Sequence, residues 1–407
     1  MGIDRKTPDN SWEPMQYETL SWEYDADALS GISKTARSRI LPTYEASIPL
    51  KIADKAIELP LDLSERIGQL LASLARIDTE QQIRGYDIPS LLLRSESSAS
   101  SQIENLTANA RNIALAELSN SAPQNAKLIA GNIAAMRAAL NGGADLSVAE
   151  IERVHAALIG EHADFGGKIR TEQVWIGGYP YSPHGALFVP PAANRVPDYL
   201  DDIVAFSKRR DINPIAKAAI SHAQFETVHP FIDGNGRTGR ALLHKMLRND
   251  DVLFSTLPIS AGLLHDIDNY MSAIKDYQNG NPIAIVEQIV LALEKASVLA
   301  RACAKELDGV LSAWREQITE RKSAKMHSLP YILLRQPVVD TSFVANELGI
   351  TQRAALSLVE RACEYGMLRP MGNRKRGEFY QSDAIIDVLD KISSKDEIRR
   401  VLASGKL

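Results

Sequence analysis

Apolar residues recur at helical spacing along most of the chain. One apolar stripe follows an i, i+3, i+4, i+7, i+10 pattern and consists of Ile67, Leu70, Leu71, Leu74 and Ile77. Further helices are expected over about 128–140, 148–159, 197–206 and 214–228, and then on to about residue 325. Residues 1 to about 60 lack this periodicity, so we expect an irregular arm that aromatic side chains pin to a core. These patterns predict a mainly α-helical protein.

Glycine and proline interrupt the helical pattern after Phe165. The short apolar runs 174–176 and 187–189 lie between them and are predicted to form the two strands of a hairpin. Capping residues mark the helix starts on either side. Ser147 with Glu150 is typical of a capping box, and Asn213 precedes a proline at the first helical position.

The pattern changes again near residue 330. Residues 343–348 suit a short helix ended by Gly349, and Thr351 is expected to cap a second helix. A basic turn at 372–377 follows. Helix, turn, helix and a hairpin with a basic tip is the element order of a winged helix, which we predict for 326–407. One function of this module would be DNA binding, and protein binding is the alternative. The cationic side chains that could contact DNA phosphates are Arg353, Arg374, Lys375 and Arg376.

The length of 407 residues indicates two or three domains. A hydrophobic fraction of 45% and a charged fraction of 24% suit a packed protein, and a net charge of -5 argues against a surface that binds nucleic acid throughout. The two cysteines, Cys303 and Cys363, are far apart, lack metal-ligand spacing and are expected to be buried thiols. Since no apolar run approaches about 20 residues, we expect a cytoplasmic protein without membrane contact.

Candidate chemistry gathers in the segment from His229 to Arg240. Gly234-Asn-Gly236 lies between two helices, where glycine lets the backbone turn tightly and the next helix presents free N–H groups to an anion. Arg237 and Arg240 are three apart and share one face of the first helical turn, which suits a polyphosphate. Asp233 could hold Mg²⁺ together with phosphate oxygens. His229 could act as the base for an attacking hydroxyl.

The same segment resembles the signature of the Fic family. His-Pro-Phe, two variable positions, Gly-Asn-Gly-Arg, two more positions and Arg are all matched. The resemblance implies a Fic-type helical core that transfers AMP from ATP to a Tyr, Ser or Thr hydroxyl of a target protein, or of itself. It implies that His229 is the base and that Asp233 binds Mg²⁺. The implied nucleotide-binding residues are Gly234, Asn235, Gly236, Arg237, Thr238, Gly239 and Arg240.

Two further segments resemble parts of the same family. Residues 174–189 look like the flap, a hairpin on which a target segment would dock as an added strand. Tyr270 and Tyr277 lie in a stretch that resembles the lining of the adenine pocket, although core packing suits either tyrosine as well. With the arm, the first helices and the winged helix, the resemblance suggests three domains: residues 1–110, a catalytic core at 111–325, and 326–407.

The family's inhibitory motif has a counterpart near the end of the first predicted domain. Ser100-Ser-Gln-Ile-Glu104-Asn105 resembles Ser or Thr, three variable positions, Glu, and Gly or Asn. The resemblance implies that Glu104 pairs with Arg240 in the place of the γ-phosphate. ATP would then bind with its α-phosphate badly aligned for attack.

Other functions remain open at this stage. A DNA-binding regulator could use a Fic-like core to sense nucleotide, although a sensor has no need of the His229 base. The enzyme could also transfer another nucleotide or a phosphocholine group. Alternatively, it could remove AMP from a modified protein, with Glu104 positioning a water. The oligomeric state is open, with a homodimer as one alternative.

Overall fold

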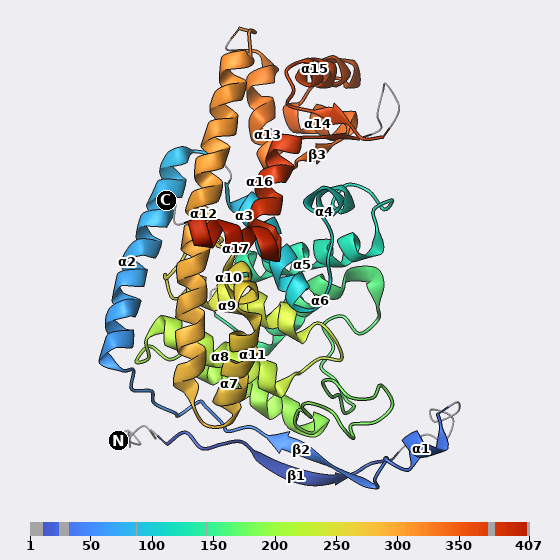
Figure 1. The fold of residues 1–407 in the computed structure, drawn as a ribbon, viewed down its shortest axis with the longest axis vertical. Helices are drawn as coiled ribbons and strands as arrows, with labels where there is room; N and C mark the ends of the chain where they lie inside the picture. The colour runs from blue at the N-terminus through green and yellow to red at the C-terminus, as the bar shows by residue number, and fades with distance from the viewer. Residues whose placement is uncertain are drawn as a thin grey trace. The chain divides into compact units, whose positions relative to one another are not determined.

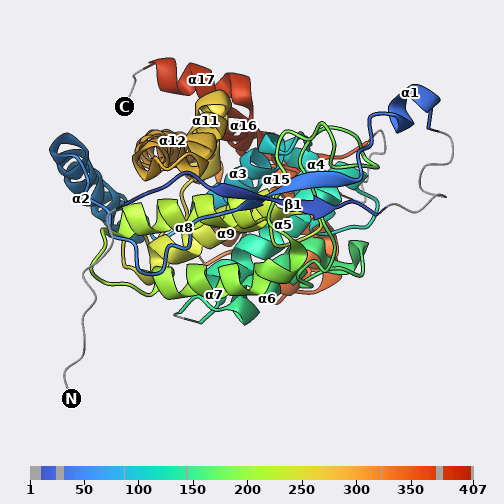
Figure 2. The same cartoon turned by 90° about the horizontal axis from the view of Figure 1, so that it is seen from below.

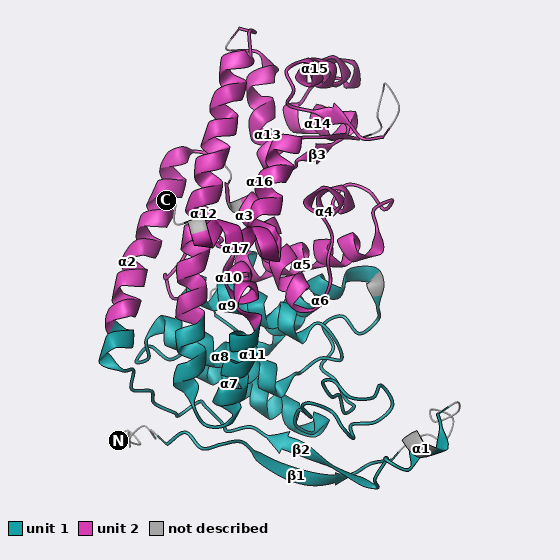
Figure 3. Ribbon diagram, in the orientation of Figure 1, with its two compact units in different colours: residues 1–64, 141–249, 268–288 teal, residues 65–140, 250–267, 289–407 magenta. Residues whose placement is uncertain are grey.

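The computed structural model describes residues 11–23, 32–86, 88–143, 145–321, 323–372 and 379–404. It is mainly helical, with two small antiparallel sheets, as the sequence pattern predicts. The chain forms two compact units, which Figure 3 colours separately. The first unit comprises residues 1–64, 141–249 and 268–288, and the second comprises 65–140, 250–267 and 289–407. The three-domain division given above stays a prediction.

Helix α8, Pro214–Val228, is the central element of the first unit. Almost all of its side chains are buried, because α8 itself carries small and apolar residues on every face. It packs against α7, Val196–Ser207, and α9, Asn235–Asn249, as both ribbon views show (Figures 1 and 2). Helix α6, Val148–Ile159, packs against α9, and α11, Ile267–Gln278, lies largely in the same unit. The segment 229–234 is the short connection between α8 and α9.

The N-terminal arm is more regular than expected. Strand β1, Gln16–Ser21, pairs antiparallel with β2, Thr43–Ile48, and a short helix α1, Lys34–Arg37, lies between them (Figure 1). The expectation of an irregular arm was therefore wrong for these strands. In β1 more and less exposed residues alternate from Tyr17 onwards, which is the period-two pattern of a strand. Aromatic anchoring is confirmed at Trp12, whose ring lies against Tyr277 of α11 with ring centroids 6.2 Å apart.

The predicted flap hairpin is reduced to two isolated antiparallel bridges. Among the described flap residues Ile176 pairs with Phe188, with Ile176 N donating to Phe188 O over 2.8 Å, and Tyr179 pairs with Ser182 near the tip. Gly177 has a φ of 72° and turns the chain away directly after the first bridge. On the other side the Gln173 Nε2 amide donates to Pro190 O over 2.9 Å, where a strand would donate a backbone N–H. The predicted strands at 174–176 and 187–189 therefore do not form, because a side-chain amide takes the place of a backbone N–H beside the first bridge.

The second unit is built around long helices. Helix α2, Leu61–Arg84, runs along α12, Pro282–Gln317, and ion pairs join Arg66 to Glu294 and Arg84 to Asp308. Helices α4, Ala110–Ala116, and α5, Gln124–Asn141, also belong mainly to it. Three 3₁₀ turns occur among the described residues of the chain, at Gly160–His162, Ala193–Arg195 and Lys325–Ser328. In the ranges given above, no helix is both long and apolar enough to cross a bilayer.

Helix α3, Ile88–Ile103, carries a buried polar run at 95–101. Ser95 Oγ donates to Ile392 O over 2.6 Å, and Gln102 Nε2 donates to Ser393 O over 2.5 Å. Glu96 is fully buried and accepts the backbone N–H of Ser260, at the start of α10, Ile259–His265, over 2.7 Å. The run is polar because its side chains bind other helices within the second unit, not because it faces solvent.

The C-terminal part contains two adjoining helices and a small sheet. Helix α13, Leu329–Arg335, precedes α14, Thr341–Leu348, and α15, Gln352–Glu364. Strands Val338–Val339, Arg369–Pro370 and Tyr380–Gln381 form a sheet of order β3-β5-β4. Helices α16, Asp383–Ser393, and α17, Lys395–Ser404, follow. The order suits the predicted winged helix. Residues 373–377 of its basic turn lie outside the described residues, so the winged helix and DNA binding stay predictions.

Candidate active site

His229 ends helix α8 in a left-handed conformation, with φ 51° and ψ 62°. This region is uncommon for residues other than glycine, although histidine tolerates it better than most. The Nδ1 atom lies 3.2 Å from Glu226 O. Since a carbonyl can only accept, this contact places the ring proton on Nδ1 and leaves the lone pair on Nε2. The side chain is only partly buried, so Nε2 can serve an incoming hydroxyl.

Asn235 fixes the loop that follows His229. Its side-chain oxygen accepts Phe231 N, and its amide donates to Phe231 O, each over 2.9 Å. Gly234 has a φ of 80°, and a Cβ there would lie 2.8 Å from Leu158 Cδ2. Both the backbone conformation and the packing therefore require glycine at this position. Gly234 makes the predicted tight turn, whereas Asn235 and Gly236, expected to lie between the two helices, are already the first residues of α9.

The start of α9 presents backbone donors. The first helical hydrogen bond runs from Thr238 N to Gly234 O at 3.0 Å, so the N–H groups of residues 235–237 point out of the helix end. Arg237 is 6% exposed, and its Nε is buried without a hydrogen-bond partner among the described residues. Arg240 is 2% exposed. Free N–H groups, a buried guanidinium with an unused donor and a helix N-terminus fit an anionic phosphate chain.

Asp233 supplies the carboxylate of this loop, and it is exposed. Its side chain is 67% exposed and lies 3.4 Å from an Arg237 nitrogen, while its Oδ1 accepts Gly234 N over 2.6 Å. Across the described parts of the chain, no group of three or more His, Cys, Asp or Glu residues could hold a metal ion. A lone carboxylate fits Mg²⁺ only when the phosphates supply further oxygen ligands.

Thr238 and Gly239 face the interior rather than the loop. Thr238 is fully buried, and a Cβ at Gly239 would lie 2.7 Å from Glu226 Oε1 and 3.0 Å from Phe225 Cδ1. Gly239 therefore allows α8 and α9 to approach closely. Direct nucleotide binding by these two side chains stays a prediction.

Sequence reasoning missed two residues that reach this loop from elsewhere. His155, on α6, is fully buried, and its Nε2 lies 3.0 Å from Asp233 O. Arg170 is 2% exposed, and its Nε donates to His229 O over 2.8 Å. Each side chain is polar within an apolar environment, which is the only local signal that the sequence offers.

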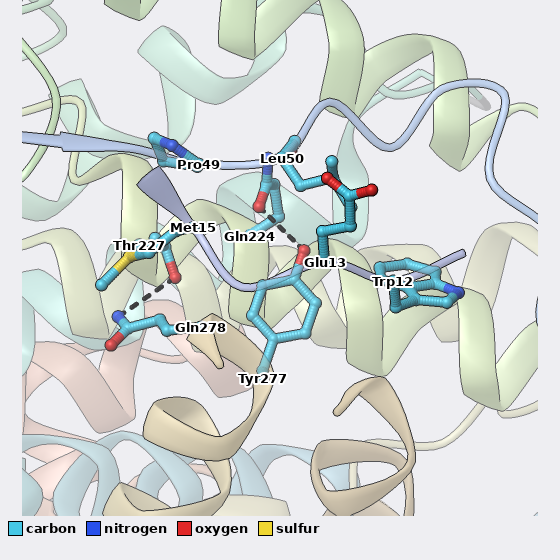
Figure 4. Close-up of a pocket in the computed structure, with 9 residues that line it drawn as sticks. All are labelled: Trp12, Glu13, Met15, Pro49, Leu50, Gln224, Thr227, Tyr277 and Gln278. Atoms are coloured by element: carbon cyan, nitrogen blue, oxygen red, sulfur yellow. Dashed lines mark hydrogen bonds between the residues drawn. The ribbon is translucent and has the colours of Figure 1, made fainter. Parts of the chain in front are cut away.

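Tyr270 and Tyr277 are both buried on α11. The Tyr270 hydroxyl lies 2.8 Å from His222 Nε2, and the Tyr277 hydroxyl donates to Gln224 Oε1 over 2.8 Å. Tyr277 lines a small pocket between the N-terminal arm and α8, in which its ring faces Trp12 (Figure 4). Both hydroxyls are bonded to α8, so these tyrosines pack the core of the first unit, and an adenine-binding role stays a prediction.

Ser100 and Glu104 belong to the end of α3 in the second unit. Ser100 is buried on the helix, and Glu104 is exposed in the turn that follows it. Asn105 has a φ of 61°, the left-handed conformation that commonly ends a helix and that glycine and asparagine adopt most readily. This explains why the motif has Gly or Asn at its last position. The Glu104–Arg240 contact joins two units that are described separately, and it stays a prediction.

Comparison with known proteins agrees with this geometry. Residues 145–247 match the Fic/DOC family, and these residues include α6, α8 and the loop 229–240. Residues 145–247 are therefore a Fic domain. A Fic family protein from Desulfovibrio desulfuricans has a similar fold, with a TM-score of 0.54 at 19% identity, covering 80% of this chain and 97% of that one.

Curated relatives of the Fic-domain protein are named protein adenylyltransferases. One from Caenorhabditis elegans is 36% identical over 118 residues, which cover 28% of this chain and 22% of the relative. A probable protein adenylyltransferase of Aquifex aeolicus is 27% identical over 253 residues, covering 58% of this chain and 72% of the relative. The match to the first spans about a fifth of that relative's length, so its activity enters below only as a proposal.

Acid is expected to destabilise the first unit of the Fic-domain protein. Burial lowers the pKa of His155 to about 4 and, together with Arg240, that of His222 to about 3. Unfolded histidine titrates near 6.5, so the unfolded chain binds protons that the native unit does not, and stability is lost as pH falls from about 6.5 towards 4. At about 1.4 kcal/mol per pKa unit, His155 alone contributes about 3 kcal/mol.

Urea unfolding between pH 7 and pH 4.5 measures this loss. His155→Phe should show a shallower decline than the parent, because it removes one of the two titrating groups. Equal slopes for the parent and this variant would contradict the assignment.

Proposed function

We propose that this protein is an adenylyltransferase that transfers AMP from ATP to a hydroxyl side chain of a target protein. One observation carries the proposal: His229 offers a ring nitrogen lone pair beside a helix N-terminus that presents free N–H groups and the buried Arg237. That arrangement suits a base next to a polyphosphate. The names of the curated relatives support the same reaction.

The reaction requires little covalent chemistry from the chain itself. The target hydroxyl oxygen attacks the α-phosphorus of ATP, its proton passes to His229 Nε2, and the bond from the α-phosphorus to the bridging oxygen breaks. Pyrophosphate leaves with that bonding pair. The N–H groups of residues 235–237 hold the α- and β-phosphates, and Arg237 and Arg240 hold the outer ones. Catalysis is then mainly alignment and charge stabilisation.

Mg²⁺ would accompany ATP, with Asp233 as its ligand from the chain. When bound, the ion neutralises phosphate charge. Asp233 is exposed and its Oδ1 already accepts Gly234 N, so the carboxylate is oriented towards the start of α9. Tyr270 and Tyr277, both on α11, would line one side of the adenine site.

The flap is proposed to receive the target. Ile176 is 38% exposed and Leu187 is 86% exposed, although Ile176 pairs with Phe188 and Leu187 adjoins that bridge. On the other side of the hairpin Val189 O already accepts Ser47 N from β2. The edge at 174–177 is therefore the one that would pair with an extended target segment. Apolar side chains beside that edge would contact alternate residues of the target.

Glu104 is proposed to inhibit this activity by pairing with Arg240. A carboxylate can accept two N–H groups of the buried Arg240 guanidinium and sets a negative charge against the γ-phosphate. Release of that pair would restore the γ-phosphate site. The last turn of α3, which contains Ser100, would fix the position of Glu104.

Intact-mass measurement tests the donor. The Glu104→Gly protein is incubated separately with ATP, GTP, UTP and CDP-choline, each with Mg²⁺. We expect a mass gain of one AMP group with ATP and none with the other donors. Transfer of a different group would replace the proposed reaction, and loss of AMP from a modified protein would favour the removal reaction.

A further inference from the structure

Two buried polar side chains hold the main chain of the loop 229–234 from outside it. His155 comes from α6, and Arg170 comes from the segment that leads into the flap. Both belong to the first unit, and the contacts described below are to main-chain groups and to one aromatic ring. Burying two cation-forming groups is costly unless their hydrogen bonds are made. Their partners therefore indicate what they do.

His155 joins the loop to the start of the flap segment. Gly167 N donates to His155 Nδ1 over 2.9 Å, and Nε2 lies 3.0 Å from Asp233 O. Because an amide N–H can only donate, Nδ1 is the acceptor, so the ring proton is on Nε2 and is donated to the Asp233 carbonyl. The imidazole also stacks on Phe231, with centroids 3.7 Å apart and planes within 10°. One neutral ring thus fixes the loop at residues 231 and 233.

Arg170 fixes the other end of the loop. Its Nε donates to His229 O over 2.8 Å, and one terminal nitrogen donates to Pro191 O over 2.5 Å. Its own backbone N–H donates to Pro230 O over 2.9 Å. These bonds connect the end of α8 to both ends of the flap segment. A planar guanidinium has five donors in a fixed fork that holds several carbonyls in set directions, whereas the three donors of a lysine ammonium rotate about a single atom.

These hydrogen bonds fix the main chain at the two ends of the loop, next to the His229 base and next to the start of α9. Arg170 holds the carbonyl of His229, whose left-handed backbone sets the direction of its imidazole. His155 holds the carbonyl of Asp233, directly before the glycine that opens α9. A main-chain shift at either residue changes the distance from His229 Nε2 to the α9 N-terminus. Misplacing reacting groups by about 1 Å can cost about 10²-fold in rate.

We propose that His155 and Arg170 are positioning residues that set the spacing between the His229 base and the phosphate site. This proposal rests on the proposed function. It goes beyond it by assigning a role to two residues outside the 229–240 segment.

Matched substitutions of His155 separate its two hydrogen bonds. Phenylalanine keeps the stacking on Phe231 but loses both bonds. Asparagine places its polar atoms near the Nδ1 position, and glutamine places its amide nitrogen near the Nε2 position. In the Glu104→Gly background, we expect kcat to fall about 10- to 100-fold for His155→Phe and His155→Asn, and to stay within about threefold for His155→Gln. KM for ATP should change less than kcat.

Arg170→Lys provides an independent second variant. It keeps the charge and most of the length but loses the planar set of donors. We expect a fall of about 10- to 100-fold in kcat and a melting temperature closer to the parent than that of Arg170→Met.

A spectroscopic readout distinguishes positioning from loss of structure. Imidazole ¹⁵N spectra of His229 should show a proton on Nδ1 in the parent and in His155→Gln, and tautomer exchange in His155→Phe and Arg170→Lys. Rescue by His155→Gln is the result expected from positioning alone. The proposal is overturned if glutamine is as slow as phenylalanine, or if all variants match the parent in both kcat and the His229 spectrum. If the Glu104→Gly parent transfers no AMP, the proposed function fails, while the His229 spectra still decide the positioning role.

Discussion

Replacing His229 by alanine in the Glu104→Gly background is expected to lower AMP transfer by about 10²- to 10⁴-fold, the range of a lost general base. The remaining rate would come from phosphate alignment at the start of α9, which the substitution does not touch. ATP affinity should stay within about threefold, because the nucleotide is held by residues 234–240 rather than by the imidazole.

Labelled-ATP incorporation measures the rate, and calorimetry measures ATP binding. His327→Ala is a suitable control, because His327 belongs to the second unit and its Nε2 contacts Glu320 O at 3.1 Å. That variant should keep the parent rate. A His229→Ala protein that retains a tenth of the parent rate would exclude His229 as the base.

Replacing Glu104 by glycine is expected to raise self-modification by about 10- to 100-fold. A charge-assisted hydrogen bond contributes about 1.5–3 kcal/mol, and each 1.4 kcal/mol corresponds to a factor of ten. Asn105 already supplies the left-handed residue that ends α3, so glycine at 104 leaves the helix end intact. Glu104→Gln should give an intermediate rate, because it removes the charge but keeps a hydrogen-bonding group.

Asp251→Gly is the matched control for this experiment. Asp251 is an exposed carboxylate of the second unit, and its φ of 56° accepts glycine. The same loss of a negative charge there should leave the rate of label incorporation unchanged. Inhibition by Glu104 is contradicted if Glu104→Gly is no faster than the parent or than Asp251→Gly.

Local chemistry explains what could be predicted from the sequence. The predicted caps are confirmed at Ser147, whose hydroxyl accepts Glu150 N, at Asn213, and at Thr351. The helix end at Gly349 is confirmed by its φ of 62°. The glycine of the tight turn before α9 could also be recognised locally, although its packing against Leu158 could not. Such features are encoded within a few residues, so one sequence is enough to find them.

Contacts over long sequence separations could not be predicted in the same way. His155 lies 78 residues before its partner Asp233, and Arg170 lies 59 residues before His229. Strands β1 and β2 pair across a connection that has no tight-turn signature. The polar run on α3 gives no sign that its partners are residues 260, 392 and 393. A hydroxyl bonded to a distant carbonyl resembles a solvated one in sequence.

The bonds from α3 to α16 have a practical consequence for anyone who divides this chain. Ser95 and Gln102 each donate to a carbonyl at the end of α16, and Arg94 donates to Gln336 Oε1 over 2.7 Å. A chain cut near residue 325 would remove all three acceptors at once and open their donors to water, with a loss of about 0.5–1.5 kcal/mol for each hydrogen bond. The helix that carries the Ser100–Glu104 motif would then be altered by the cut itself. A gain of activity after such a truncation would therefore say nothing about what the C-terminal residues bind.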